Sequence, residues 1–77
     1  MSDPLDIDAI GLLCPWPVLK AQKALRGMVP GARLRLAATD AVAVIDVPHF
    51  CDEHGHRLVE TSEADGVTYY LIEKGTG

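Results

Sequence analysis

The sequence predicts an α+β fold, a two-layer α/β sandwich of order βαβαββ in which two helices cover one face of a four-stranded mixed sheet. Three observations lead to this fold. The chain of 77 residues has room for one domain, residues 1–77, and no second core. Apolar residues alternate in some segments, as in half-buried strands, and recur every three or four positions in others, as in helices. Finally, two strand-like runs near the end flank an Asp-Gly pair, a strong hairpin signal.

The first strand and the first helix are expected within residues 5–26. Residues 5–10 alternate in the period of a half-buried strand, and Gly11 interrupts the run. A helix is predicted over residues 18–26, with its apolar residues on one face. Pro17 suits the first turn, where a missing N–H costs nothing, and Gly27 suits the exit.

The second strand and the second helix follow a turn at residues 28–31. Residues 33–36 alternate between arginine and leucine, which predicts a strand that Asp40 closes. Asp40 or Asp46 can cap a helix, and Pro48 fits the first turn of one that begins after Asp46. We therefore expect a short turn and then a helix through Glu53.

The last two strands form a predicted hairpin. Residues 57–63 and 67–74 are β-prone runs, and Ala64-Asp65-Gly66 joins them. The four strands then share one sheet, and the two helices cover its apolar face.

Charge argues against nucleic acid as the main partner. The formal net charge is -4, whereas binding to a nucleic-acid backbone depends mainly on lysine and arginine. Residues 15–35 hold five basic residues and no acid, while residues 36–77 hold eight acids and two basic residues. We expect no direct DNA binding.

The cytoplasm is the expected location. No apolar run approaches the roughly 20 residues of a membrane span, and the first residues lack the basic and apolar regions of a signal peptide. Two cysteines are too few for the disulfide framework of a small secreted domain, so a reducing compartment would keep both as thiols. A reactive thiol is therefore possible.

Cys14 is the candidate reactive residue, because it lies between the first strand and the first helix. There its sulfur would face unpaired N–H groups, which lower a thiol pKa from about 8.5 and favour the thiolate. Pro15 and Pro17 would hold the turn rigid on either side. The alternative is a buried cysteine that packs as a small hydrophobe. No general base stands nearby in sequence, which fits a carrier better than a hydrolase.

Cys51 is expected to be structural, buried on the second helix against the sheet. Two other interpretations stay open: a resolving thiol for Cys14, or a metal ligand together with His54 and His56. Zinc sites usually need four ligands, often in two separated pairs, so no metal is expected. No cofactor is expected either.

Four side chains at the first helix are candidates for partner contact. Trp16 stands beside the thiol, and tryptophan is enriched at interface hot spots, although core packing is an alternative. Lys20, Lys23 and Arg26 recur every three residues and could steer an acidic partner, or they could form an ordinary solvated face.

Residues 8–17 resemble the Asp-x-x-Gly-Leu-x-Cys-Pro-x-Pro signature of the TusA, SirA and YedF family of sulfur-carrier proteins. A second stretch, from Ala38-Thr39-Asp40 through Asp46-Val47-Pro48 and Phe50-Cys51 to Leu58, is similar to the central pattern of that family. Together the likeness covers about residues 5–74. Ile7 stands where the family often has leucine, a change that alters packing little.

The resemblance implies a βαβαββ sandwich similar to the C-terminal domain of the third bacterial translation initiation factor. It also implies a sulfurtransferase that acts as a persulfide relay, with Cys14 as the persulfide site. The donor would be a cysteine desulfurase or a rhodanese-like protein, and the acceptor another sulfur-relay protein. Family members serve tRNA 2-thiouridine formation, molybdenum cofactor assembly and the oxidation of inorganic sulfur compounds.

Persulfide exchange on Cys14 is the leading hypothesis. One alternative is a non-catalytic regulatory module that binds RNA or protein, and the acidic balance makes RNA the weaker choice of the two. Another is a thiol-disulfide switch between Cys14 and Cys51.

Overall fold

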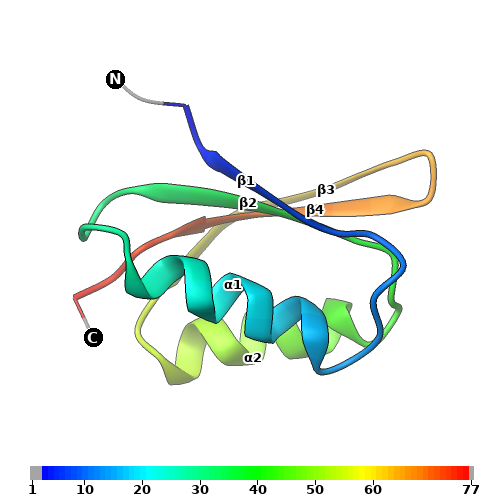
Figure 1. Cartoon of the computed structure of the whole chain (residues 1–77), viewed down its shortest axis with the longest axis horizontal. Coiled ribbons are helices and arrows are strands. Elements are labelled where there is room, and N and C mark those ends of the chain that lie inside the picture. Colours follow the sequence, from blue (N-terminus) through cyan, green and yellow to red (C-terminus); the bar gives the residue numbers. More distant parts are fainter. Residues whose placement is uncertain (1–2, 77) are drawn as a thin grey trace.

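The computed structural model describes residues 3–76, which form two layers, a sheet and a pair of helices (Figure 1). The elements follow the predicted order, β1 (Leu5–Ala9), α1 (Trp16–Arg26), β2 (Arg33–Ala38), α2 (Ala43–Glu53), β3 (Arg57–Ala64) and β4 (Val67–Glu73). Both helices lie on the same face of the sheet (Figure 1). The predicted α+β sandwich is confirmed.

The four strands form one mixed sheet in the order β1-β2-β4-β3. β1 and β2 are parallel, with Ile7 opposite Leu36, and α1 makes the crossover between them. β4 is antiparallel to both of its neighbours. The β3–β4 turn has positive φ at Asp65 (53°) and Gly66 (79°), as a two-residue hairpin turn requires, so the Asp-Gly prediction is confirmed.

The core lies between the sheet and the helices. On β2, Leu34 and Leu36 point into it with no exposed surface, while Arg33 and Arg35 face solvent on the uncovered side of the sheet. This alternation follows from the two-residue period of a strand. The helices contribute Pro17, Ala21 and Leu25 from α1 and Ala43, Val47, Phe50 and Cys51 from α2.

The expected start of the second helix was wrong, because α2 begins at Ala43 rather than after Asp46. Asp40 initiates the turn: its carbonyl oxygen accepts the N–H of Ala43 (3.1 Å), and its Oδ1 accepts the N–H of Val42 (3.2 Å). Neither Asp40 nor Asp46 is the N-cap residue, and Pro48 lies inside the helix. The apolar face of α2 is buried against the sheet, and this burial stabilises the helix by more than the missing backbone hydrogen bond at Pro48 costs.

Smaller differences occur at other boundaries. The first helix begins at Trp16, before the predicted 18, and β2 continues to Ala38. Over residues 3–76, neither helix is long and apolar enough to cross a membrane.

Candidate functional site

Cys14 lies in the exposed loop between β1 and α1, and side chains from the segment after β2 hold that loop in place. The backbone N–H of Cys14 donates to Oδ2 of Asp40 over 2.7 Å. The N–H of Gly11 donates to Oγ1 of Thr39 over 2.9 Å. Because β1 and β2 are parallel neighbours, both segments leave the sheet at the same edge. The parallel pairing therefore brings Asp40 to Cys14 across 26 positions of sequence.

The turn from Cys14 into α1 is closed by the backbone. The N–H of Trp16 donates to the carbonyl oxygen of Leu13 over 2.9 Å, and the Cys14–Pro15 peptide bond is cis. Pro17 is buried in the first turn of α1. Pro17 thus lies in the first turn, as predicted, whereas Pro15 is the N-cap residue because the helix begins at Trp16, two residues before the predicted start.

The sulfur of Cys14 contacts a carboxylate that was not predicted to lie beside it. Sγ donates to Oδ2 of Asp46, in the first turn of α2, over 2.8 Å. This hydrogen bond, with some desolvation and the negative charges of Asp46 and Asp40, raises the pKa of Cys14 above its ordinary value. The prediction that the helix start lowers the pKa and favours the thiolate is therefore wrong.

The reason is that α1 and α2 begin at the same edge of the sheet, so acidic side chains at the start of α2 reach the loop that precedes α1. A signal was present in the sequence. Two helices that each follow a parallel strand start at one edge, and Asp40 and Asp46 both stand near the second start. Sequence reasoning treated these residues as helix caps and missed their contact with the cysteine.

A shallow depression surrounds the thiol. It is lined by Cys14, Pro15, Pro17, Val18, Asp40, Ala43 and Asp46. Because the thiol is exposed at a surface depression, a group on another molecule can reach it directly.

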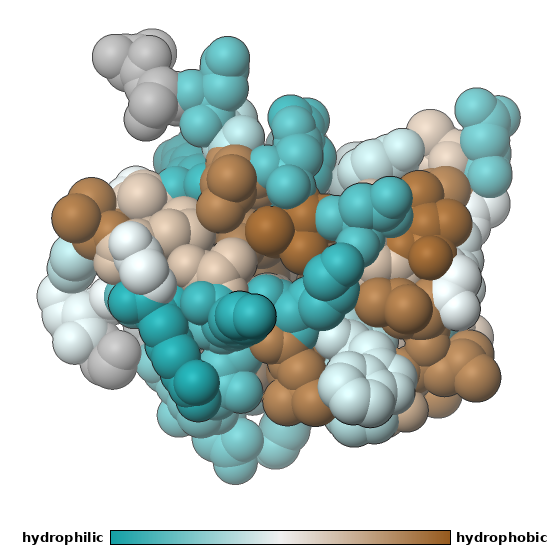
Figure 2. All heavy atoms as spheres, viewed as in Figure 1, coloured by the Kyte–Doolittle hydropathy of each residue, from teal (hydrophilic) through white to brown (hydrophobic). Residues whose placement is uncertain are grey.

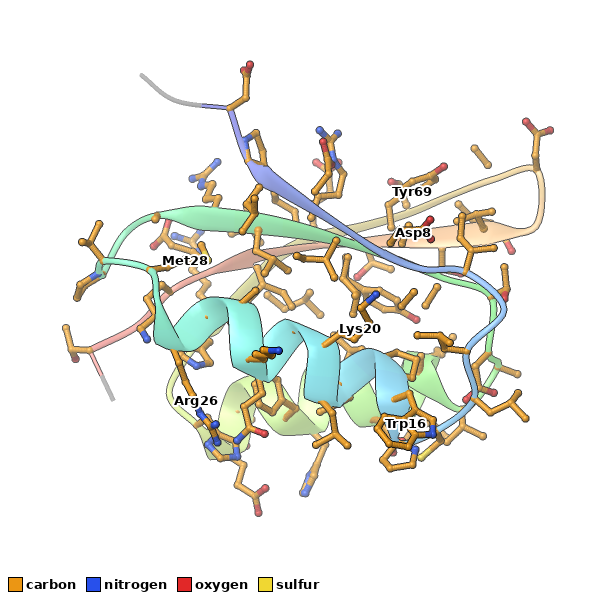
Figure 3. All side chains as sticks on the ribbon, viewed as in Figure 1. Asp8, Trp16, Lys20, Arg26, Met28 and Tyr69 are labelled. Atoms are coloured by element: carbon orange, nitrogen blue, oxygen red, sulfur yellow. The ribbon has the colours of Figure 1, made fainter. Side chains whose placement is uncertain are left out.

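Exposed apolar side chains lie on the three segments that form this end of the molecule: the β1–α1 loop, the start of α1 and the start of α2. Trp16 is 59% exposed and Ile45 is 72% exposed. In Figure 3, Trp16 projects from the first turn of α1 on the side away from the sheet, and Figure 2 shows brown, apolar surface around this end. Core packing of Trp16, the alternative interpretation, is wrong. We call this surface the apolar rim, which comprises Ile10, Leu13, Trp16, Leu19, Val42, Val44 and Ile45.

The three basic residues of α1 do not gather at the thiol. Nζ of Lys20 donates to the backbone oxygen of Asp8 over 2.9 Å. Lys23 and Arg26 lie exposed in the last turn of α1, and Figure 3 shows Arg26 at the opposite end of the helix from Trp16. Their role in partner contact stays a prediction.

Cys51 is buried, as expected, with 2% of its surface exposed on the sheet-facing side of α2. Burial raises its pKa to about 11, so at neutral pH it is a thiol and a poor nucleophile. Both cysteines are free, and Cys51 packs in the core while Cys14 lies at the surface. This arrangement favours the structural role over the resolving thiol.

The histidines near Cys51 make contacts of other kinds. His54 and His56 pack against the ring of Phe50, with ring centroids 4.8 Å and 5.7 Å away. Nδ1 of His56 accepts the backbone N–H of Gly75 over 3.0 Å. Among residues 3–76, no three side chains of metal-ligating type are grouped closely enough to hold a metal ion.

Comparisons with known proteins agree with the resemblance. The model of the family described as Sulfurtransferase TusA matches residues 5–74. The sulfur carrier protein TusA of Pseudomonas paraeruginosa (strain DSM 24068 / PA7) is 42% identical over 76 residues, which cover 96% of each chain. The crystal structure of a SirA-like protein from Desulfitobacterium hafniense is similar with a TM-score of 0.81 and 29% identity, over 92% of this chain and 97% of that one. This chain, with its surface cysteine at the start of the first helix, therefore belongs to the TusA family of sulfur carriers.

Proposed function

We propose that this protein carries sulfur as a persulfide on Cys14, taking it from a donor protein and passing it to an acceptor protein. One observation carries the proposal: the Cys14 thiol is exposed on a loop that backbone hydrogen bonds hold in place, at the end of the molecule that also bears the apolar rim. A persulfide bound there projects outward to a second protein. Pro15 and Pro17 shape the turn that presents it.

The loading step is a displacement at sulfur. Cys14 first loses its proton to water, and the thiolate then attacks the outer sulfur of a persulfide on the donor. A new S–S bond forms to Sγ, and the S–S bond within the donor breaks. The electron pair of the broken bond leaves with the inner sulfur of the donor, which becomes a thiolate and takes up a proton. Sulfur moves with no net oxidation or reduction, so no cofactor is required.

The unloading step is the same exchange in the opposite sense. An acceptor thiolate attacks the outer sulfur of the Cys14 persulfide, and Sγ leaves as a thiolate that is protonated again. Cys14 ends in its starting state, so the protein acts as a sulfurtransferase of the relay type.

The donor that we propose is a cysteine desulfurase or a rhodanese-like protein, and the acceptor is another sulfur-relay protein. Acceptors from tRNA thiolation, molybdenum cofactor assembly and sulfur oxidation are the three classes to test. Trp16 contributes contact area to both partners, because its ring lies exposed two residues from the thiol. Transfer through a free thiol suits a reducing compartment, and we place the carrier in the cytoplasm.

The test is to incubate the protein with a cysteine desulfurase and cysteine, and then to map added mass without reductant. We expect one extra sulfur atom on the peptide that contains Cys14. Cys14→Ser should gain none, whereas Cys51→Ala, which keeps the surface thiol, should load normally. Sulfur on the Cys14→Ser protein, or an unmodified wild-type Cys14 with several desulfurases and rhodanese-like donors, would overturn the proposal.

A further inference from the structure

Two carboxylates face Cys14, and their charges are not balanced within the described chain. Oδ2 of Asp46 accepts the Sγ proton over 2.8 Å, and Oδ2 of Asp40 accepts the backbone N–H of the same residue over 2.7 Å. Among residues 3–76, the ion pairs involve the carboxylates of Asp6, Glu53 and Glu73, and neither Asp40 nor Asp46 takes part in one.

Other charged groups near Cys14 and Asp46 make other contacts. His49 of α2, which lines a surface depression with Asp46, lies 3.8 Å from the carboxylate of Glu53. Lys20 of α1 donates to the backbone oxygen of Asp8, and the side chain of Asp8 accepts the N–H of Ile10 over 2.9 Å. The charged groups that contact Cys14 are therefore Asp46 from α2, at the sulfur, and Asp40 from the segment after β2, at the backbone N–H.

This geometry favours the protonated form of the sulfur. The S–H hydrogen bond to Asp46 exists only while Cys14 is a thiol, because a thiolate has no proton to donate. Once ionised, the sulfur would also be repelled by the carboxylate it now binds. A hydrogen bond to the neutral form and a nearby like charge both disfavour ionisation, and the raised pKa of Cys14 agrees with this.

We propose that Asp46 holds Cys14 as a protonated thiol in the free carrier, and that a sulfur donor makes it nucleophilic by placing a basic side chain against Asp46. The inference rests on the proposed sulfur transfer and names the chemistry of the partner: an apolar surface that carries a lysine or arginine. Asp46 is a catalytic residue in this scheme, because it touches the reacting sulfur.

The apolar rim supplies the conditions for such a switch. A partner that covers exposed side chains such as Ile45 and Val42 removes water from the start of α2, where Asp46 lies. Charge interactions strengthen when water is excluded, so a basic group there pairs with Asp46 more strongly than it would in bulk solvent. The charge of Asp46, once paired, no longer opposes the thiolate, and Sγ releases its proton to water as the partner approaches.

The first experiment needs no sulfur donor. We would measure the rate of Cys14 alkylation by iodoacetamide against pH, with peptide mass spectrometry to separate Cys14 from Cys51. Asp46→Asn should lower the pH midpoint and raise the rate at pH 7.5 several-fold, about tenfold for each pH unit by which the midpoint falls. Asp46→Lys should lower the midpoint further. Asp52→Asn, a neutralised acid at an exposed position of the same helix, is the matched control and should leave the profile unchanged.

Thermal melting of each variant checks that it folds. A midpoint that stays or rises in folded Asp46→Asn would overturn the role of Asp46. This assay measures thiol reactivity alone. It can therefore confirm the role of Asp46 even if Cys14 carries no sulfur, and sulfur loading of Cys14 can be confirmed even if Asp46 has no such role.

The second experiment tests the basic group of the partner by sulfur uptake from a persulfide-loaded desulfurase. Asp46→Lys should take up sulfur several-fold more slowly than Asp46→Asn despite its more reactive thiol, because the new cation repels the basic side chain of the donor. Uptake rates that follow thiol reactivity across wild type, Asp46→Asn and Asp46→Lys would overturn the proposed partner chemistry.

Discussion

Replacing Trp16 by alanine tests whether the apolar rim is the surface that partners touch. Trp16 is 59% exposed, in the first turn of α1 and two positions from the thiol. A partner that transfers sulfur to Cys14 must come close to this ring. The substitution should therefore weaken transfer while leaving the fold nearly unchanged.

The expected magnitude follows from the exposed area. With 59% of a tryptophan surface of roughly 250 Å² open to solvent, about 150 Å² is available for burial by a partner. At about 25 cal/mol per Å², complete burial would contribute roughly 3 to 4 kcal/mol, an upper value because binding also costs ordering and desolvation. A hot-spot loss of about 2 kcal/mol is the realistic expectation, which corresponds to a roughly 30-fold weaker interaction.

The assay is the initial rate of sulfur loading at increasing carrier concentration with a fixed amount of persulfide-loaded donor. We expect Trp16→Ala to raise the half-saturating carrier concentration roughly 30-fold. Thermal melting should show a change in unfolding free energy of less than about 1 kcal/mol, because little of the side chain is in the core. Val29→Ala is the matched control: this residue is 70% exposed in the turn after α1, at the other end of that helix (Figure 1).

Two results would refute the reasoning. Equal small effects of Trp16→Ala and Val29→Ala on half-saturation would show that partners do not touch Trp16. A large loss of stability in Trp16→Ala would show that the ring supports the fold instead, and the loading defect would then have another cause.

Three further predictions concern Tyr70, His56 and Cys51. The hydroxyl of Tyr70, a residue only 1% exposed, makes no hydrogen bond of good geometry among the described residues, although the side chain of Thr68 lies near it. Tyr70→Phe should therefore leave the unfolding free energy unchanged or raise it by up to about 1 kcal/mol, and a clear loss in denaturant melts would contradict this. Burial first, and then the charges of Lys74 and His54, hold the pKa of His56 below its ordinary 6.5. The unfolded chain therefore binds this proton more readily than the folded chain, and the unfolding free energy should fall as pH drops below about 6.5. His56→Gln should flatten this pH dependence between about pH 7.5 and 5.5, and an unaltered pH dependence would exclude His56 as its cause. Cys51, with a pKa of about 11, should react with iodoacetamide at pH 8 only in urea, and rapid labelling of native protein would contradict its burial.

The fold was largely predictable because its signals are local. The alternation of Arg33 to Leu36 and the Asp65-Gly66 turn describe the geometry of a few neighbouring residues, and both predictions were confirmed. The start of α2 was not predictable in this way. Pro48 suggested a later start, whereas burial of Ala43 and Val47 against the sheet extends the helix to the earlier residue.

The candidate site was likewise predictable only where its signals are local. The placement of Cys14 between a strand and a helix follows from local pattern alone, since the breaks at Gly11 and Pro17 mark both boundaries. Local pattern also implied a lowered pKa, because it considers only the N–H groups of the first helix. The contact with Asp46, 32 positions away, reverses that direction.

By itself, the sequence determined the order of the strands and helices, the family and the position of the candidate thiol, because each depends on residues close together in the chain or on a short motif. Only the tertiary structure decided the protonation environment of that thiol and the exposure of Trp16. The parallel pairing of β1 and β2 starts both helices at one edge of the sheet, and this sets the carboxylates of Asp40 and Asp46 beside Cys14. The charge state of a side chain depends on its neighbours in space, and those neighbours come from segments that only folding brings together.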